Sequence, residues 1–151
     1  MMKNKILILI IGLVVVSAIW YYKSITIEEL SDNVEMKNIE VKLGNNKLFI
    51  IPNIHGVSGN HQRITITEDN DSIYKKEVDY AFFTSEIYYR IENDKVIVYA
   101  PGSSVLEPMD SKSNLLKYVI VKPLKNAGEV NDYDKNYEKY NLKKVSVYTK
   151  E

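Results

Sequence analysis

Residues 87–100 read IYYRIENDKVIVYA, two runs of β-branched and aromatic side chains separated by Asn93-Asp94. Asn and Asp tolerate the positive φ that a two-residue hairpin turn requires. In the resulting register, one face carries the pairs Ile91–Val96, Tyr89–Val98 and Ile87–Ala100, and the other face carries Glu92–Lys95 and Tyr88–Tyr99. Because one register satisfies the turn, the charge pair and an apolar face, the stretch predicts an antiparallel β-hairpin.

Period-two alternation on both sides of the hairpin predicts further strands. They are expected at residues 39–43, 48–51, 63–67, 72–79, 115–122 and 144–149. Gly44-Asn45-Asn46 supplies turn residues between the first two, and Pro52 and Pro123 are expected to end the strands that precede them. About seven or eight short strands at this spacing are typical of a mainly β fold, an antiparallel sandwich or a curled sheet.

One amphipathic helix is expected late in the chain. Val130, Tyr133, Tyr137 and Tyr140 recur at intervals of three and four, with charged residues between them. This spacing predicts about three helical turns whose apolar side packs on an edge or end of the sheet.

The N-terminal segment predicts a membrane anchor. The run from Ile6 to Tyr22 contains no charged side chain. Its 17 residues would span about 25 Å as a helix, close to the roughly 30 Å of a bilayer's hydrocarbon core. The residues expected to contact lipid or the membrane interface are Ile6, Ile10, Leu13, Val16, Trp20, Tyr21 and Tyr22.

The charges that flank this run predict its orientation. Lys3 and Lys5 precede it, whereas Lys23 is followed by acidic residues. The positive-inside tendency therefore predicts a single-pass protein of the cell membrane. In this arrangement residues 1–5 are cytoplasmic, 6–22 span the bilayer, 23–35 are juxtamembrane and 36–151 form an extracytoplasmic β-rich domain.

A cleaved signal peptide is the alternative interpretation. Val16-Ser17-Ala18 fits the small-residue cleavage pattern, and cleavage after Ala18 would release a secreted chain. The new terminus would begin with the apolar Ile19-Trp20, which favours retention as an anchor. Both interpretations predict export.

The composition narrows the class of protein. The chain has 20 basic and 20 acidic residues, so it lacks the excess of basic charge typical of nucleic-acid-binding proteins. It contains no cysteine, which excludes disulfides and thiolate zinc sites. Its 12 tyrosines reflect either codon usage and β-propensity or an aromatic binding face.

Two histidines, His55 and His61, are weak candidates for metal ligands. A metal site would need a third ligand such as Glu68 or Asp69, and the alternative is a glycine-containing loop between two strands. Ser58 lies in the same segment, but its neighbours do not form the G-x-S-x-G motif of serine hydrolases. No cofactor and no catalytic residue is expected.

Residues 132–138 resemble the start of a calcium-binding loop. However, Tyr137 replaces the glycine required at the sixth position, and Lys143 replaces the glutamate required at the twelfth. A solvated helix face explains these carboxylates better.

These observations favour a membrane-anchored envelope protein with a non-enzymatic binding domain. The connection from residue 100 to 114 is long and partly apolar, so it is a candidate binding loop or a packed flap. The residues proposed for a partner face, which another envelope protein could contact, are Tyr88, Tyr99, Leu106 and Met109. Two alternatives are an exported enzyme or metal-dependent module that uses the His55/His61 loop, and a structural envelope protein that self-associates through its sheet edges.

Overall fold

The computed structural model describes Val15, Ser17 and residues 36–55, 61–71 and 73–148. The chain divides into two compact units, Met1–Glu35 and Met36–Glu151. Apart from Val15 and Ser17, the segments predicted as cytoplasmic start, membrane anchor and juxtamembrane stretch lie outside the described residues. Within the described residues, no helix is both long enough and apolar enough to cross a membrane.

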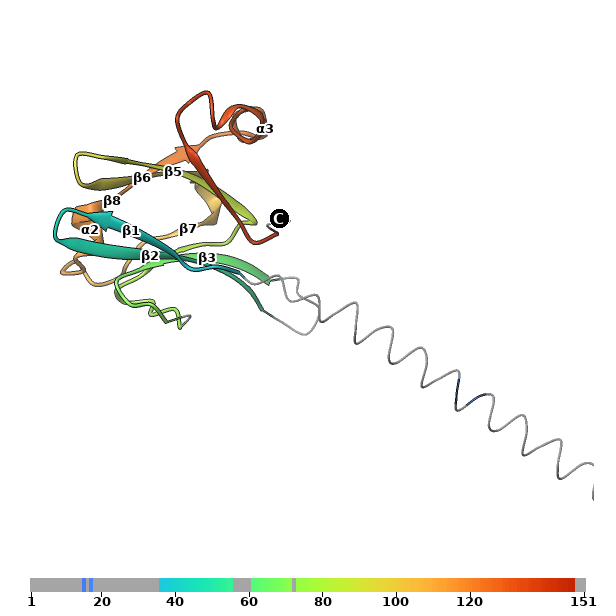
Figure 1. Ribbon diagram of the computed structural model, residues 1–151, viewed down its shortest axis with the longest axis horizontal. Coiled ribbons are helices and arrows are strands. Elements are labelled where there is room, and N and C mark those ends of the chain that lie inside the picture. The colour runs from blue at the N-terminus through green and yellow to red at the C-terminus, as the bar shows by residue number, and fades with distance from the viewer. Residues whose placement is uncertain (1–14, 16, 18–35, 56–60, 72, 149–151) are drawn as a thin grey trace, which may run out of the picture. The chain divides into compact units, whose positions relative to one another are not determined.

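Residues of the second unit form two β-sheets that pack face to face (Figure 1). Sheet A is antiparallel and has the order β1 (Ile39–Leu43), β2 (Asn46–His55), β3 (His61–Thr67), β4 (Tyr80–Phe82), β7 (Val105–Leu106). Sheet B is mixed and has the order β8 (Val119–Leu124), β6 (Lys95–Pro101), β5 (Glu86–Glu92), β9 (Lys143–Ser146). The short helices are η1 (Gly102–Ser104), α2 (Leu115–Tyr118) and α3 (Ala127–Asn136). The mainly β prediction is confirmed, but β6 and β8 pair in parallel, so the fold is not wholly antiparallel.

The predicted hairpin is confirmed as β5 and β6. Glu92 pairs with Lys95, and Tyr88 pairs with Tyr99. Asn93 and Asp94 have φ angles of 51° and 54°, as a two-residue turn with two left-handed residues requires. The first hairpin also turns over two residues, and its Gly44 adopts a φ of 57°, a conformation that favours glycine.

The main core lies between the two sheets, where alternate residues of the strands on each side turn inward. Sheet A contributes Val41, Leu43, Leu48, Ile50, Ile64, Ile66, Tyr80 and Phe82. Sheet B contributes Ile87, Tyr89, Val96, Val98, Ala100, Val119 and Val145. Packing of these apolar side chains holds the cysteine-free domain together.

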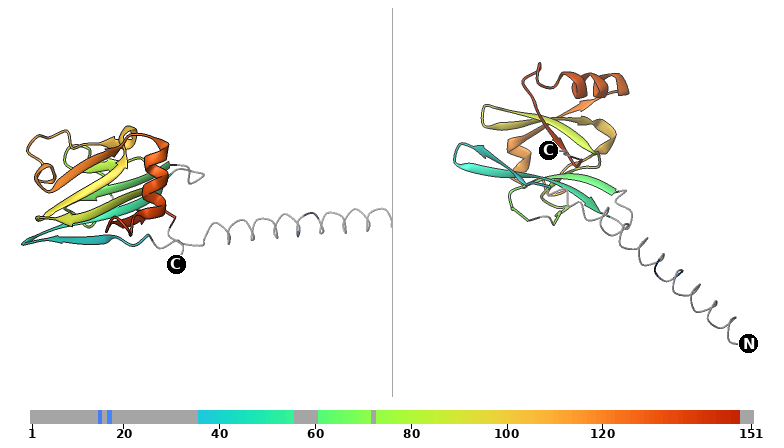
Figure 2. Two further views of the ribbon diagram at one scale, coloured as in Figure 1. Left: turned by 90° about the horizontal axis from the view of Figure 1, so that it is seen from above. Right: turned by 45° about the vertical axis from the view of Figure 1, so that its right-hand side comes forward.

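Helix α3 covers the outer face of sheet B, where it crosses the strands and forms a third layer (Figures 1 and 2). Its half-buried Val130 and Tyr133, with Tyr137 at its end, pack on a second cluster that includes Tyr88 and Tyr99. The predicted helix is confirmed as Ala127–Asn136, although it ends before Tyr140, and it packs across the strands on the outer face of sheet B. The side chains that α3 covers include Tyr88 and Tyr99, and covering them removes apolar surface from water.

The strand predicted at residues 72–79 is wrong. Residues 73–79 are irregular and include a turn, in which the amides of Val78 and Asp79 bond to the carbonyl of Lys75 at 3.0 and 2.9 Å. The buried Asp79 carboxylate also accepts the Lys75 amide at 2.8 Å. A side chain that bonds to nearby backbone stabilises a turn in competition with a strand.

The strand predicted at residues 115–122 is replaced by α2 followed by β8. Pro123 does not end this strand, because β8 is an edge strand and needs ladder bonds on one side only. Pro52 does not end β2 either. The pairing of β2 with β1 stops at Ile50, so the missing Pro52 amide interrupts no described bond to β1.

The long connection after β6 is not a simple loop. After η1, residues Val105 and Leu106 form β7, which pairs with β4 at the edge of sheet A. The chain therefore crosses from sheet B to sheet A and returns through α2 to β8.

Candidate functional site

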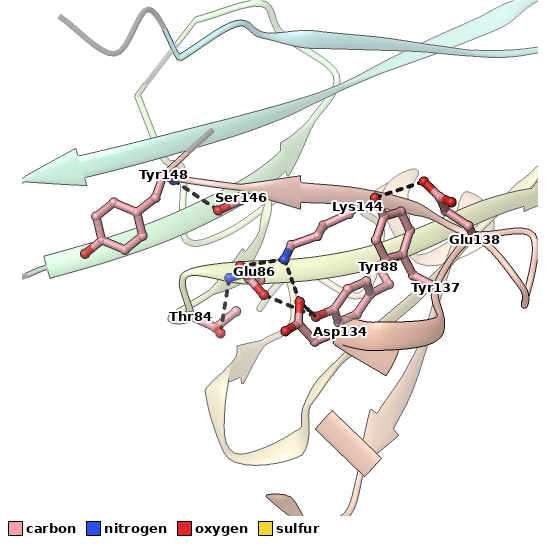
Figure 3. Close-up of polar contacts among 9 residues, drawn as sticks. All are labelled: Thr84, Glu86, Tyr88, Asp134, Tyr137, Glu138, Lys144, Ser146 and Tyr148. Atoms are coloured by element: carbon pink, nitrogen blue, oxygen red, sulfur yellow. Dashed lines mark hydrogen bonds and ion pairs between the residues drawn. The ribbon is translucent and has the colours of Figure 1, made fainter. Parts of the chain in front are cut away.

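An open depression of about 320 Å³ lies beside β5 and β9 of sheet B. It is lined by Glu86, Tyr137, Lys144, Ser146 and Tyr148 and is called the Lys144 depression below. Glu86 is directly opposite Ser146 in the antiparallel ladder. The depression is thus built on a regular part of the sheet, with Tyr137 supplied by the end of α3 (Figure 3).

The ammonium group of Lys144 joins three elements of the fold. Its Nζ atom lies 2.8 Å from Glu86 Oε1 of β5 and 2.6 Å from Asp134 Oδ1 of α3 (Figure 3). Both distances are typical of charge-assisted hydrogen bonds. The cluster therefore fixes α3 and β9 to β5, and two of its members, Glu86 and Lys144, form the charged floor of the depression.

The contacts in this cluster raise the pKa of Lys144 and lower the pKa of Asp134. Burial opposes the charge of Lys144, but its hydrogen bonds to Asp134 and Glu86 outweigh this effect and raise its pKa above that of ordinary lysine. The hydrogen bond from Lys144 is the main reason why the pKa of Asp134 is lowered. Both groups are therefore charged at neutral pH.

Tyr88 lies beneath the carboxylates. Its hydroxyl donates toward Glu86 Oε2 at 3.2 Å and toward Asp134 Oδ1 at 3.4 Å. Burial, reinforced by these two negative charges, raises the pKa of Tyr88 well above that of ordinary tyrosine. The hydroxyl is thus a stable hydrogen-bond donor. The Tyr88 ring also lies 6.1 Å from the Tyr137 ring and 6.0 Å from that of Tyr133.

Two tyrosines flank the charged floor. Tyr137 is half-buried, and its hydroxyl donates to Glu138 Oε1 at 3.3 Å. Tyr148 is 53% exposed, and its hydroxyl accepts a hydrogen bond from Gln62 of β3. Figure 3 shows Lys144 and Ser146 between these two rings.

The sequence of β9 accounts for this arrangement. Lys144 and Ser146 alternate with Val145 and Val147, which are buried in the main core. Because side chains alternate across a strand, the polar residues lie on the opposite face, beside α3.

The predicted partner face is only partly exposed. Tyr88 and Tyr99 are 1% and 8% exposed because α3 covers them, so the expectation that these two form an open surface is wrong. Leu106 and Met109 are exposed, but they lie on and after β7 of sheet A. The structure therefore does not bring the four residues together on one exposed face.

The two histidines lie side by side, His55 as the last residue of β2 and His61 as the first residue of β3. His55 pairs with His61, and their rings stack with centroids 5.6 Å apart. Glu68 and Asp69 follow the opposite end of β3, about 23 Å along an extended strand, so they cannot complete a site with these rings. Among the described residues, no group of three or more metal-ligating side chains gathers at one point. Ser58 lies outside the described residues.

The residues that resemble a calcium loop belong to α3 and the turn after it. Asp134 bonds to Lys144 as described, and Asp132 accepts a hydrogen bond from the Tyr140 hydroxyl at 2.7 Å. The helical interpretation of these carboxylates is confirmed.

Sequence reasoning did not identify the Lys144 cluster. Its members come from residues 86, 134 and 144, and nothing in their spacing indicates that β5 pairs with β9. The alternation of polar and apolar residues from 144 to 148 could have indicated that Lys144 and Ser146 share the face of the strand that does not enter the core. Comparisons with protein-family models, curated proteins and solved structures found no match to this chain.

Proposed function

We propose that this chain is a single-pass, membrane-anchored envelope protein whose exported domain binds a partner and catalyses no reaction. The anchor is residues 6–22, with residues 1–5 in the cytoplasm. The sequence supports this placement, because the uncharged run of 17 residues is preceded by Lys3 and Lys5. Secretion after cleavage at Ala18 is the alternative that the experiments below distinguish from anchoring.

The binding role is supported chiefly by the chemistry of the Lys144 depression. A general acid or base works best when its pKa lies near the working pH. Here Lys144 bonds to both Glu86 and Asp134, which raises the pKa of Lys144 and lowers the pKa of Asp134, so both values lie farther from neutral pH. Charged groups held in one protonation state suit recognition better than proton transfer.

The location can be tested with reporter fusions to the C-terminus of the full chain. Alkaline phosphatase is active only after export, and a cytosolic reporter is active only inside the cell. We expect activity from the phosphatase fusion alone. Leu13→Arg, which places a charge in the middle of the apolar run, should abolish it. Activity from the cytosolic reporter alone would contradict the proposal.

The mass of the exported chain distinguishes a retained membrane anchor from a cleaved signal peptide. An intact N-terminus in the membrane fraction supports an anchor, whereas a soluble chain that begins at Ile19 shows cleavage after Ala18. The second result would replace anchoring with secretion.

The binding role can be tested by photo-crosslinking in intact cells. A photoreactive residue replaces Tyr148 in the depression, or Phe83 as a control of similar exposure on the chain segment after β4. We expect a discrete adduct from position 148 that position 83 does not give. The same adducts at both positions, or none at either, would argue against a partner at this site.

A further inference from the structure

We propose that the Lys144 depression binds a neutral, hydroxyl-rich ligand, namely one or two units of an oligosaccharide. This inference rests on the binding role proposed above and names the ligand class for the same site. Four properties of the depression support it: its charge, its hydrogen-bonding groups, its aromatic sides and its size.

The charge of the site disfavours ionised ligands. An anion entering the depression would approach the carboxylate of Glu86, and a cation would approach the ammonium of Lys144. Like charges at short range repel each other. The three groups carry a net charge of −1, and Lys144 is already bonded to both carboxylates, so a neutral ligand can bind without displacing it.

The polar groups of the site match those of a sugar hydroxyl. Lys144 directs two of its three N–H donors at Glu86 and Asp134, and each carboxylate can accept more than the bonds described. The Tyr148 hydroxyl accepts from Gln62 and lies at the end of the ring away from Lys144 (Figure 3), so the polar contacts come from Glu86 and Lys144. A hydroxyl both donates and accepts, so a polyol can use such a mixed set of groups.

The aromatic sides of the site suit a ligand with one apolar surface. Tyr137 and Tyr148 stand on either side of the polar floor (Figure 3). A tyrosine ring offers a rigid apolar surface with a polar tip, and the C–H face of a sugar ring is a matching apolar surface. Packing on the rings and hydrogen bonds to the floor can therefore form together.

The size and openness of the site fit a short part of a longer chain. A volume of about 320 Å³ is at the small end of ligand pockets, which range over roughly 300–1,000 Å³. Because the depression is open, an oligosaccharide can continue beyond it.

The test is calorimetric titration of the full chain, purified in a detergent that contains no sugar. Neutral probes are N,N′,N″-triacetylchitotriose and cellotriose. Charged probes of the same length are chitosan trimer, which is cationic, and trigalacturonate, which is anionic. We expect saturable binding of at least one neutral probe and affinities at least about tenfold weaker for both charged trimers.

Variants locate the binding. Tyr148→Ala should weaken the affinity for the neutral probe by about three- to tenfold, which is the typical value of one aromatic contact. Phe83→Ala is the matched control, because it removes an exposed aromatic ring from the chain segment after β4, and it should leave the affinity unchanged. Circular dichroism on both variants checks that the domain remains folded. Glu86→Gln provides a second test at the floor if Tyr148→Ala does not fold.

Three results would overturn the inference: no binding of either neutral probe at millimolar concentration, tighter binding of a charged trimer, or equal affinities of the Tyr148→Ala and Phe83→Ala variants. A specific crosslink at position 148 together with any of these would leave the proposed binding role intact and refute only the ligand class. Loss of both the crosslink and the sugar binding would refute the binding role itself.

Discussion

The substitution Lys144→Met tests whether the Lys144 cluster stabilises the domain. Methionine keeps an unbranched side chain of similar length and removes the ammonium group. The variant loses the contacts of 2.8 Å to Glu86 and 2.6 Å to Asp134 and leaves two carboxylates near each other without their cation. It should therefore unfold more easily than the unmodified chain.

The structure sets the size of this effect. Hydrogen bonds to charged groups contribute about 1.5–3 kcal/mol when they are buried, and exposed ion pairs contribute about 0–1 kcal/mol. The side chains of Lys144, Glu86 and Asp134 are 25%, 31% and 46% exposed, which is between these cases. We therefore expect a loss of about 1–3 kcal/mol in the free energy of unfolding, and a fall of roughly 4–12 °C in Tm.

The effect should depend on pH in a defined direction. The pKa of Asp134 is lowered in the folded protein, so its stabilising contribution is complete above the ordinary aspartate pKa and disappears as the pH falls through the folded value. The pKa of Lys144 is raised, so its contribution is lost only as the pH rises above the ordinary lysine value. The difference between the two proteins should be full at pH 7 and should shrink at pH 3.

Urea denaturation of the full chain in a non-ionic detergent, at pH 7 and pH 3, measures this difference. Lys143→Met is the matched control, because Lys143 is its neighbour on β9 and its Nζ lies over the Tyr89 ring at 6.0 Å. We expect a change below about 1 kcal/mol for the control. Equal losses for the two variants, or a Lys144→Met loss that persists undiminished at pH 3, would refute the reasoning.

Three further substitutions probe other parts of the domain. Tyr133→Ala removes the ring that lies 5.2 Å from the Tyr99 ring, and it should lower the free energy of unfolding by about 1–2 kcal/mol. The amides of α3 should then exchange hydrogen faster than those of the sheets, and equal protection of helix and sheets would contradict this role. Gly44→Ala places a Cβ at a φ of 57° and should cost about 1–2 kcal/mol, so an unchanged urea midpoint would argue against the turn described. Ser113→Ala removes a 2.7 Å hydrogen bond to the Val78 carbonyl and should cost about 1 kcal/mol, measured as a lower Tm, and no decrease would show that this bond contributes little.

Local pattern was sufficient for the elements whose partners are close in the sequence. The β5–β6 register follows from Asn93-Asp94 and the charge pair next to it, because a two-residue turn aligns only one set of neighbours. The helical spacing from Val130 to Tyr137 likewise predicted α3, since i, i+3 and i+4 neighbours are set by helix geometry alone.

Local pattern was misleading where a long-range contact outweighs it. The apolar run at residues 115–122 has the residues of a strand, yet Leu115 is buried in the main core as part of α2. The turn at residues 75–79 depends on Asp79, whose carboxylate is buried and bonded to the backbone. Such choices are made by the packing around a segment, which its own periodicity does not contain.

The amino-acid order alone settled which side chains share a face of each strand, because alternation is a property of the extended backbone. It therefore separated Tyr88 and Tyr99 from the residues that enter the main core. Whether that second face was open or covered depended on where α3 would pack, and the candidate site depended on β9 pairing with β5. Both are contacts between residues far apart in the chain. They depend on how much apolar surface the whole folded domain buries, which a local sequence pattern does not determine.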